Sequence, residues 1–476
     1  MTVKTVFFDM GGTIDTNWYS PEMRLAATPA LQKYLLSHGL NFHLDDKQLY
    51  ELITTGLASY HKWRLATQEE LPPSQVWREY IFINYPADFN RLDSIAEDLM
   101  VWIETHYYQR QMRPEIPAVL DSLQKNGYKI GLISNVNSRG QVPLNLSQYG
   151  IKHYFDPIVL SSEYRHRKPN PAIFHYAARL SNTPTSECIF IGDRISRDIL
   201  GSKRAGYKLA IQIEHAFKHG ETDNGATPDF VIKNMTELLD ILHSERQAEK
   251  PAAPFRLSDK HIRAILFDAD GILYYRNNKD HEFYSYIKEI AGTDKEIQIA
   301  EIHKISHQAF IGQMTFDQYK TAVLNMHGIT DPDLVSRGIQ ISKNEKEKII
   351  FFADTYDTLN KLKNRHLYLG IVTDTIQPLY VKLNKLERGG IGNLWDSIIP
   401  SSEVGLKKPD PRIYQLALQQ LGIKSSQAVF VGHKSSELIG AQKAGIKTVA
   451  FNYDKDAEAD FYIDNFSELA DLPILN

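Results

Sequence analysis

The stretch FFDMGGTID, residues Phe7–Asp15, decides the fold of this chain. The run Val3–Phe8 is short and rich in β-branched and aromatic residues. Because Gly11 and Gly12 follow, the pattern predicts a buried strand that ends in a tight loop. Open parallel sheets bind ligands beyond the carboxyl ends of their strands. Asp9 would face such a crevice, but an Asp after a strand also caps turns, and this stretch alone leaves both interpretations open.

The same stretch occurs a second time, as AILFDADGILY at Ala264–Tyr274, and three further motifs are repeated after it. The matching pairs are IGLISNV (130–136) with LGIVTDT (369–375), SSEYRHRKPNPAIF (161–174) with SSEVGLKKPDPRIY (401–414), and IFIGDRISRDILGSKRAG (189–206) with VFVGHKSSELIGAQKAG (429–445). Two copies of about 230 residues have the size of whole domains. We therefore predict a first domain at 1–243, a linker at 244–261 and a second domain at 262–476.

Within each copy, apolar strand-like runs alternate with amphipathic helical stretches. This alternation predicts an α/β fold with two Rossmann-like, doubly wound parallel sheets. A long insertion follows the first strand of each copy, at about 16–110 and about 275–348. Its apolar residues recur at three- and four-residue spacing, as in LQKYLLSHGL and LYELITTGLASYHKWRL, and indicate helices. We expect each insertion to form a helical cap that excludes water and selects substrates.

Composition places the chain among ordinary soluble globular proteins, with 42% hydrophobic and 24% charged residues. The net charge of -4 gives no indication that the chain binds nucleic acid or an anionic membrane. A single cysteine, Cys188, excludes an intrachain disulfide and a cysteine-rich metal site. No signal peptide or membrane span is expected, and we predict a cytoplasmic location. Packing of the two halves on each other is expected, and the oligomeric state stays open.

Four loops of the first copy converge on one edge of the predicted sheet, carrying Asp9, Ser134, Lys168, and Asp193 with Asp198. A carboxylate, a hydroxyl, an amine and two more carboxylates suit a phosphoryl group and a divalent cation. Mg²⁺ prefers carboxylate and phosphate oxygens, and an amine and a hydroxyl hold the remaining phosphate oxygens. A carboxylate nucleophile can form an aspartyl-phosphate.

The order and spacing of these residues resemble the haloacid dehalogenase superfamily, whose members are mostly phosphatases. The resemblance covers both halves. It rests on an Asp-x-Asp-x-Thr motif, a Ser or Thr that ends a strand, a Lys, and an acidic pair after Gly-Asp. The helical insertion resembles the cap of one branch of the family.

The resemblance implies roles for particular residues. In the first half Asp9 would be the nucleophile and a Mg²⁺ ligand, with the Gly11 carbonyl, Asp193 and Asp198 completing the metal site. Ser134, Asn135 and Lys168 would hold the phosphate. In the second half Asp268 would be the nucleophile, Asp270 the general acid and base, and Thr373 and Lys408 the phosphate ligands.

Each half departs from the family pattern in a different place. Gly11 stands where the family has its general acid, so the first half lacks that group. In the second half the acidic pair is replaced by His433 and Glu437, and imidazole favours softer metals than Mg²⁺. We therefore expect activity in the first half, with Mg²⁺, and leave the metal of the second half open.

Three functions are compatible with these residues. The leading one is a Mg²⁺-dependent phosphatase for a small phosphate ester. A dehalogenase also attacks through an Asp and tolerates Gly11, but a halide leaving group needs no metal, which argues against it. A scaffold or ligand-binding protein without turnover would explain the paired defects.

Overall fold

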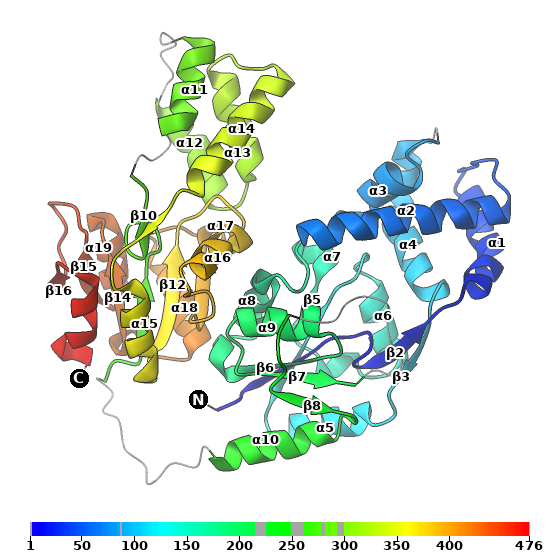
Figure 1. The fold of residues 1–476 in the computed structure, drawn as a ribbon, viewed down its shortest axis with the longest axis horizontal. Helices are drawn as coiled ribbons and strands as arrows, with labels where there is room; N and C mark the ends of the chain where they lie inside the picture. Colours follow the sequence, from blue (N-terminus) through cyan, green and yellow to red (C-terminus); the bar gives the residue numbers. More distant parts are fainter. Residues whose placement is uncertain are drawn as a thin grey trace. The chain divides into compact units, whose positions relative to one another are not determined.

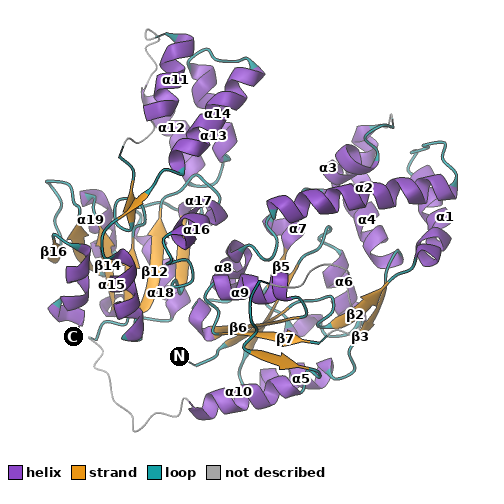
Figure 2. Ribbon diagram, viewed as in Figure 1, coloured by secondary structure: helices purple, strands orange, loops and turns teal. Residues whose placement is uncertain are grey.

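The computed structural model describes residues 2–85, 88–214, 225–248, 261–277, 281–292 and 299–475. The chain divides into two compact units, Met1–Ser181 with Ser186–Lys250, and Asn182–Thr185 with Pro251–Asn476. Figure 1 shows the course of the chain, and Figure 2 shows its helices and strands. Each unit has the predicted α/β architecture.

The core of the first unit is a six-stranded parallel sheet with strand order β5-β4-β1-β6-β7-β8. Its strands are β1 Thr5–Phe8, β4 Lys129–Ser134, β5 Ile158–Leu160, β6 Cys188–Gly192, β7 Leu209–Ile213 and β8 Phe230–Ile232. Around the sheet lie α5 Ile116–Lys125, α6 Gln141–Gln148, η2 Lys152–Tyr154, α7 Ser161–Tyr164, α8 Pro171–Leu180, η3 Thr185–Glu187, η4 Ile195–Ile199, α9 Leu200–Arg204 and α10 Glu237–Ala248.

The second unit repeats this sheet with the order β13-β12-β9-β14-β15-β16, again entirely parallel. Its strands are β9 Ala264–Phe267, β12 Tyr368–Thr373, β13 Ser397–Pro400, β14 Ala428–Gly432, β15 Lys447–Phe451 and β16 Phe461–Ile463. Its core helices are α15 Thr355–Asn364, α16 Leu379–Arg388, α17 Ser401–Val404, α18 Pro411–Leu421, η5 Ser425–Gln427, α19 Ser435–Lys443, η6 Phe466–Asp471 and η7 Pro473–Leu475.

Strand β1 shows why its sequence is apolar throughout. Successive side chains of a strand point to opposite faces of the sheet. Val6 and Phe8 pack into the core on the side of α5, α6 and α10, whereas Phe7 packs into the core on the side of α8. Both faces are covered, so no position of the strand is polar and solvated. This confirms the prediction of a buried strand at the start of each copy, and it fixes Asp9 at the carboxyl end.

Each insertion forms a helical cap, as predicted. In the first unit the cap helices are α1 Pro21–Ser37, α2 Asp46–Thr67, α3 Pro73–Val76, η1 Trp77–Ile81 and α4 Phe89–His106. In the second they are α11 His281–Ala291, α12 Ile299–Phe310, α13 Phe316–Met326 and α14 Pro332–Lys346. Both caps have their own hydrophobic cores, and in Figure 1 each helix group lies apart from the sheet of its unit.

A two-stranded antiparallel ribbon links each cap to its core, which the sequence pattern did not predict. The ribbons are β2 Asp15–Trp18 with β3 Gln109–Met112, and β10 Tyr274–Tyr275 with β11 Ile350–Phe351. The loop before each ribbon contains a glycine in the left-handed region, Gly12 at φ 86° and Gly271 at φ 92°. Only glycine adopts this conformation without strain, which explains the second glycine of the opening motif and its repeat.

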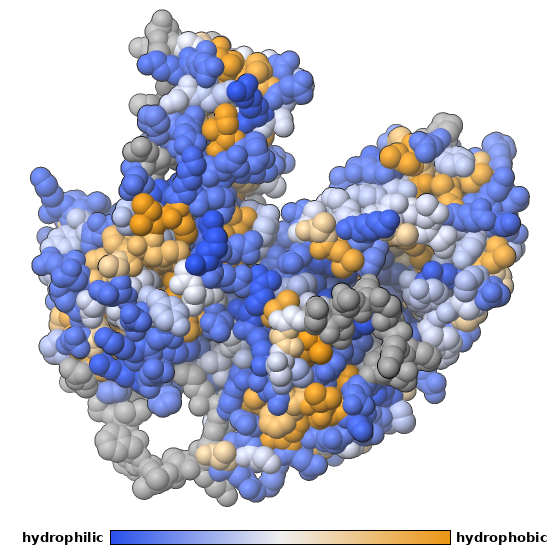
Figure 3. All heavy atoms as spheres, in the orientation of Figure 1, coloured by the Kyte–Doolittle hydropathy of each residue, from blue (hydrophilic) through white to orange (hydrophobic). Residues whose placement is uncertain are grey.

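Most of the predicted linker lies outside the described residues. Its first five residues, Ser244–Ala248, form the end of α10. On the face drawn in Figure 3, hydrophilic residues predominate and apolar residues gather in small patches. Every helix in the described ranges is too short or too polar to cross a bilayer.

Candidate active sites

Three carboxylates meet at the carboxyl edge of the first sheet. Asp9 follows β1 and Asp193 follows β6, and these neighbouring parallel strands bring the two residues together with Asp198 of η4. One oxygen from each lies within 4.8 Å of the others, and all three side chains are buried. Burial, with the nearby Asp198 and Asp9 carboxylates, raises the pKa of Asp193 to about 8.

These carboxylates fit a hard divalent cation. Asp193 Oδ1 is buried with no hydrogen-bond partner within the described part of the chain. An uncompensated buried carboxylate is costly, and coordination of a cation removes that cost. Oxygen ligands of this kind are those that Mg²⁺ prefers. The donor set therefore agrees with the predicted metal residues Asp9, Asp193 and Asp198.

Lys168 is the buried cation of this cluster. Its Nζ lies 2.8 Å from Asp9 Oδ1 and 2.7 Å from Asp198 Oδ1, and donates a hydrogen bond of 2.9 Å to the Ile133 carbonyl. Asn135 holds the backbone of Lys168 at both ends, with its Oδ1 accepting from the Lys168 N–H and its Nδ2 donating to the Lys168 carbonyl, each at 2.9 Å. The structure thus gives Asn135 a positioning contact, while its predicted phosphate contact stays a prediction.

The space beside Gly11, where the family pattern predicts a general acid, is filled by neutral and cationic groups. A Cβ atom on Gly11 would lie 2.7 Å from Asn17 Nδ2 and 3.8 Å from Arg110 Nη1. Arg110 in turn pairs with the buried Asp15 at 3.2 Å, and Tyr149 donates to the same carboxylate at 3.0 Å. These contacts keep the Asp15 carboxylate from acting as the general acid. Among the described residues, no carboxylate lies beside the Cβ position of Gly11.

A cavity of about 280 Å³ lies above this cluster and is lined by Asp9, Gly11, Ser134, Asn135 and Lys168. The cap supplies the other wall, with Tyr19, Leu57, His61, Arg64, Ile103, Glu104 and Tyr108. Residues of three motifs and of the cap thus line one space, and the fourth motif reaches this space through Arg194 and Arg197 rather than through Asp193 and Asp198.

Two buried glutamates attach this cap to the loops that follow β4 and precede α8, and neither was identified from the sequence. Glu104 of α4 accepts hydrogen bonds from the Asn137 and Ser138 N–H groups and from Ser138 Oγ. Burial raises the pKa of Glu104 to about 7 although these bonds oppose it. Glu70, just after α2, pairs with Arg167, the residue before Lys168, at 2.8 Å.

The second unit has a similar centre with a different charge balance. Lys408 Nζ lies 2.7 Å from Asp268 Oδ1 and 3.2 Å from Glu437 Oε1. His433 Nε2 lies 3.7 Å from Asp268 Oδ2. Burial alone would raise the pKa of Asp268, but Lys408 and the nearby His433 outweigh it and hold that pKa well below its usual range.

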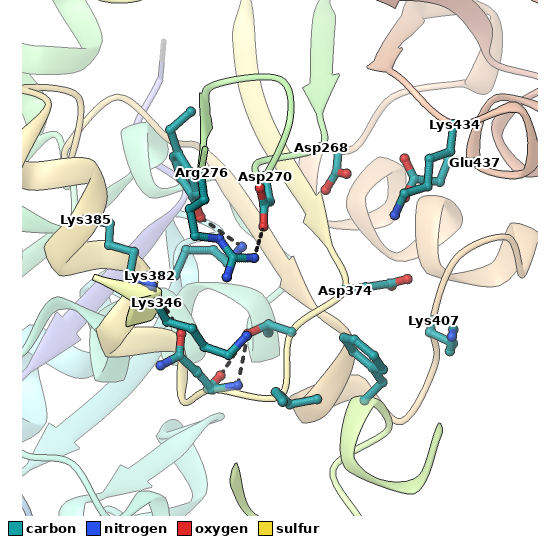
Figure 4. Close-up of a pocket in the computed structure, with 15 residues that line it drawn as sticks. Asp268, Asp270, Arg276, Lys346, Asp374, Lys382, Lys385, Lys407, Lys434 and Glu437 are labelled. Atoms are coloured by element: carbon teal, nitrogen blue, oxygen red, sulfur yellow. Dashed lines mark hydrogen bonds and ion pairs between the residues drawn. The ribbon is translucent and has the colours of Figure 1, made fainter. Parts of the chain in front are cut away.

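The predicted general acid and phosphate ligand of the second unit are both in contact with basic residues. Asp270 pairs with Arg276 at 2.7 Å. The Thr373 hydroxyl accepts a hydrogen bond of 2.8 Å from Lys382 Nζ. Figure 4 shows Arg276, Lys382 and Asp270 beside the same cavity. Sequence reasoning missed Arg276 and Lys382.

The comparisons with known proteins match each unit separately. Residues 3–206 and residues 265–451 each match a family model described as haloacid dehalogenase-like hydrolase, and the two matches together span most of the chain.

Among curated relatives, the glyceraldehyde 3-phosphate phosphatase of Methanopyrus kandleri is 27% identical over 252 residues, 50% of this chain and 97% of the relative. The N-acylneuraminate-9-phosphatase of Homo sapiens is 27% identical over 247 residues, 51% of this chain and 94% of the relative. A solved 2-haloacid dehalogenase from Pseudomonas syringae matches with 21% identity and a TM-score of 0.36, covering 44% of this chain and 97% of that one.

Proposed function

Since the chain belongs to the haloacid dehalogenase-like hydrolases, we propose that its first unit is a Mg²⁺-dependent phosphatase for a small phosphate ester. The second unit is then a degenerate partner without turnover. The observation that carries this proposal is the buried group of Asp9, Asp193 and Asp198, together with Lys168, which pairs with Asp9 and Asp198; Asp9 and Lys168 line a capped cavity. The relatives named phosphatases support the reaction class.

In the proposed reaction an Asp9 carboxylate oxygen attacks phosphorus and the substrate's ester oxygen departs with the electron pair of the P–O bond. The aspartyl-phosphate that results is opened by water, which releases phosphate and restores the carboxylate. Ser134 and Lys168 would hold the phosphate oxygens. Asp9, Asp193 and Asp198 would hold Mg²⁺, which when bound offsets negative charge on the phosphoryl group.

The dehalogenase alternative is weaker because it leaves the acidic cluster without a purpose. A halide leaves as a stable anion and needs no metal, whereas the fully buried Asp193 carboxylate oxygen without a partner suits a cation. The scaffold alternative applies better to the second unit than to the first, since only the second has lost the acidic pair.

Metal dependence is the first test of this proposal. We expect a chelator to remove aryl phosphate hydrolysis and Mg²⁺ to restore it.

Asp193→Asn in the full chain should weaken Mg²⁺ binding by about tenfold or more, because even changes to residues outside the ligand shell lower metal affinity on this scale. Calorimetric titration measures this. Asp317→Asn is the matched control, because Asp317 is an exposed carboxylate that pairs with Lys343. Equal affinities for Mg²⁺ in the two variants would contradict the assignment.

The missing general acid predicts a dependence on the leaving group. Protonation of the leaving oxygen contributes about 10²–10⁴-fold for poor leaving groups and little for a phenolate. The first unit should therefore prefer aryl over alkyl phosphates. Gly11→Asp together with Asn17→Ala, which clears the side chain 2.7 Å from the new Cβ, should lower the aryl-to-alkyl rate ratio by about tenfold or more. Asn17→Ala alone is the control, and an unchanged ratio in the double variant would show that Gly11 is not the missing acid's position.

A further inference from the structure

The cavity of the second unit is rich in basic side chains, and four of them, Arg276, Lys346, Lys382 and Lys385, lie outside its four motifs. It measures about 350 Å³, and four acidic residues line it, Asp268, Asp270, Asp374 and Glu437. Six basic residues also line it, Arg276, Lys346, Lys382, Lys385, Lys407 and Lys434. In Figure 4, Arg276, Lys346, Lys382 and Lys385 gather on one side of the space, and Asp374 and Glu437 lie on the other.

Lys382 and Lys385 are the least expected of these residues because both are buried. They extend from α16 and are only 7% and 5% exposed. Lys382 Nζ donates to two neutral groups, Thr373 Oγ1 at 2.8 Å and Tyr274 Oη at 3.3 Å. Lys385 Nζ donates to Gln377 Oε1 at 3.1 Å and lies 3.5 Å from Glu347 Oε1. The buried Lys382 ammonium, which donates to neutral groups, is unfavourable until an anion joins it, whereas Lys385 already has Glu347 as a partner.

The shared fold does not require these lysines. The corresponding helix of the first unit, α6, reads QVPLNLSQ and contains no basic residue. In α16, Leu379, Lys382, Leu383 and Leu386 follow the i, i+3, i+4, i+7 pattern, so Lys382 occupies a position of the buried face. The second unit has therefore placed a charge where packing alone would favour an apolar residue.

The same unit has lost negative charge at its metal position. His433 replaces the carboxylate that Asp193 supplies in the first unit, and Lys434 follows it. Positive charge for a phosphate ligand thus comes from side chains on three elements: the segment after β10, helix α16, and the loop before α19. Lysine is a compact point charge that serves phosphate oxygens well.

We infer that the cavity of the second unit binds a small molecule with two phosphoryl groups, without a divalent metal, through Lys382, Lys385 and Arg276. One phosphoryl group would lie against the lysines of α16 and Arg276, and the other toward Lys434, which lines the opposite side of the cavity. The volume of about 350 Å³ accommodates a molecule of this size. This inference does not depend on turnover in the first unit.

The test is calorimetric titration of the full chain with inorganic pyrophosphate in the presence of EDTA, which suppresses metal-dependent binding. We expect pyrophosphate to bind more tightly than orthophosphate. Lys382→Met and Lys385→Met should each weaken pyrophosphate binding by at least about tenfold, because each removes a charge-assisted contact. Lys361→Met is the control, since Lys361 is exposed on α15. Binding that requires Mg²⁺, or that both lysine variants leave unchanged, overturns the inference.

Thermal unfolding separates this role from a purely structural one. Without ligand, Lys382→Met should keep or raise the melting temperature, because it replaces a buried charge by an apolar side chain of similar length. A lower melting temperature combined with unchanged pyrophosphate affinity would assign Lys382 to structure and overturn the inference. If Lys382→Met does not fold, Lys385→Met and Arg276→Gln carry the same binding test.

Discussion

Asp9→Asn is expected to lower turnover of an aryl phosphate by about 10³-fold or more, whereas Asp268→Asn in the same full chain is expected to leave most of the activity. Asparagine keeps the shape of the side chain but its amide oxygen is a poor nucleophile. Within the described residues, each of the two sites has a cluster of possible metal ligands. Only the cluster that contains Asp9 consists of three carboxylates. Loss of the nucleophilic oxygen of Asp9 therefore removes the covalent step.

We expect the second unit to lack the conditions for the same chemistry. Lys408 holds Asp268 at 2.7 Å much as Lys168 holds Asp9 at 2.8 Å, but Asp268 also faces His433 at 3.7 Å, and the predicted acid Asp270 is paired with Arg276. Its Mg²⁺ position has an imidazole in place of one carboxylate. Without a metal the largest charge that stabilises the transferring phosphoryl group is absent.

The paired experiment distinguishes the two units directly. Rates are measured on one aryl phosphate with saturating Mg²⁺, and thermal unfolding verifies that both variants fold. The double variant Asp9→Asn with Asp268→Asn gives the background rate. Activity that survives Asp9→Asn and disappears with Asp268→Asn would reverse the assignment of the active unit.

The sequence predicted the fold and the convergence of the motif residues for one physical reason. Residues that directly follow parallel strands must meet at one edge of the sheet, whatever the loops do. Asp9 and Asp193 follow neighbouring strands β1 and β6, and Ser134 ends β4 on the other side of β1. Their proximity is a property of topology, and topology was readable from the alternation of strands and helices and from its repetition.

The residues that the sequence did not reveal lie in the caps or on faces that depend on packing. Glu70 and Glu104 act across the boundary between cap and core, through partners more than 30 residues away, Ser161 and Arg167 for the first and Ser138 for the second. No periodicity encodes such a pairing. The sequence does mark Lys382 as unusual, because it interrupts an apolar stripe. The long side chain of lysine commonly reaches solvent from such positions, however, so the pattern alone does not predict that Lys382 is buried.

The largest effect on stability is expected at Glu70, which is fully buried at the boundary between cap and core of the first unit. Its side chain accepts hydrogen bonds from Tyr60 at 2.5 Å, from Arg167 at 2.8 Å and from Ser161 at 2.9 Å. Arg167 is only 3% exposed, and burial together with the Arg64 guanidinium lowers its pKa to about 9 although Glu70 opposes this. Arg167 therefore depends on Glu70 for compensation, whereas Glu70 also has the Arg64 guanidinium at 3.5 Å.

Glu70→Ala should lower the free energy of unfolding of the first unit by about 3–5 kcal/mol, because it leaves the Arg167 guanidinium buried without a counter-charge. Arg167→Met should cost less, because Glu70 keeps the Arg64 guanidinium at 3.5 Å and the hydrogen bonds from Tyr60 and Ser161. Urea unfolding followed by tryptophan fluorescence measures both, since four of the five tryptophans, Trp18, Trp63, Trp77 and Trp102, belong to this unit. Glu51→Ala is the matched control on the cap surface, where the pair with Lys47 at 3.9 Å is exposed and contributes less than about 0.5 kcal/mol.

The double variant decides whether the effect belongs to the pair. Removal of both charges eliminates the uncompensated guanidinium that Glu70→Ala creates, so the double loss should be smaller than the sum of the single losses by about 1–3 kcal/mol. Strictly additive losses would mean that Glu70 and Arg167 stabilise the unit through separate contacts. A coupled pair would instead mean that a charge supplied from the cap helps to hold the loop that carries Lys168, the predicted phosphate ligand.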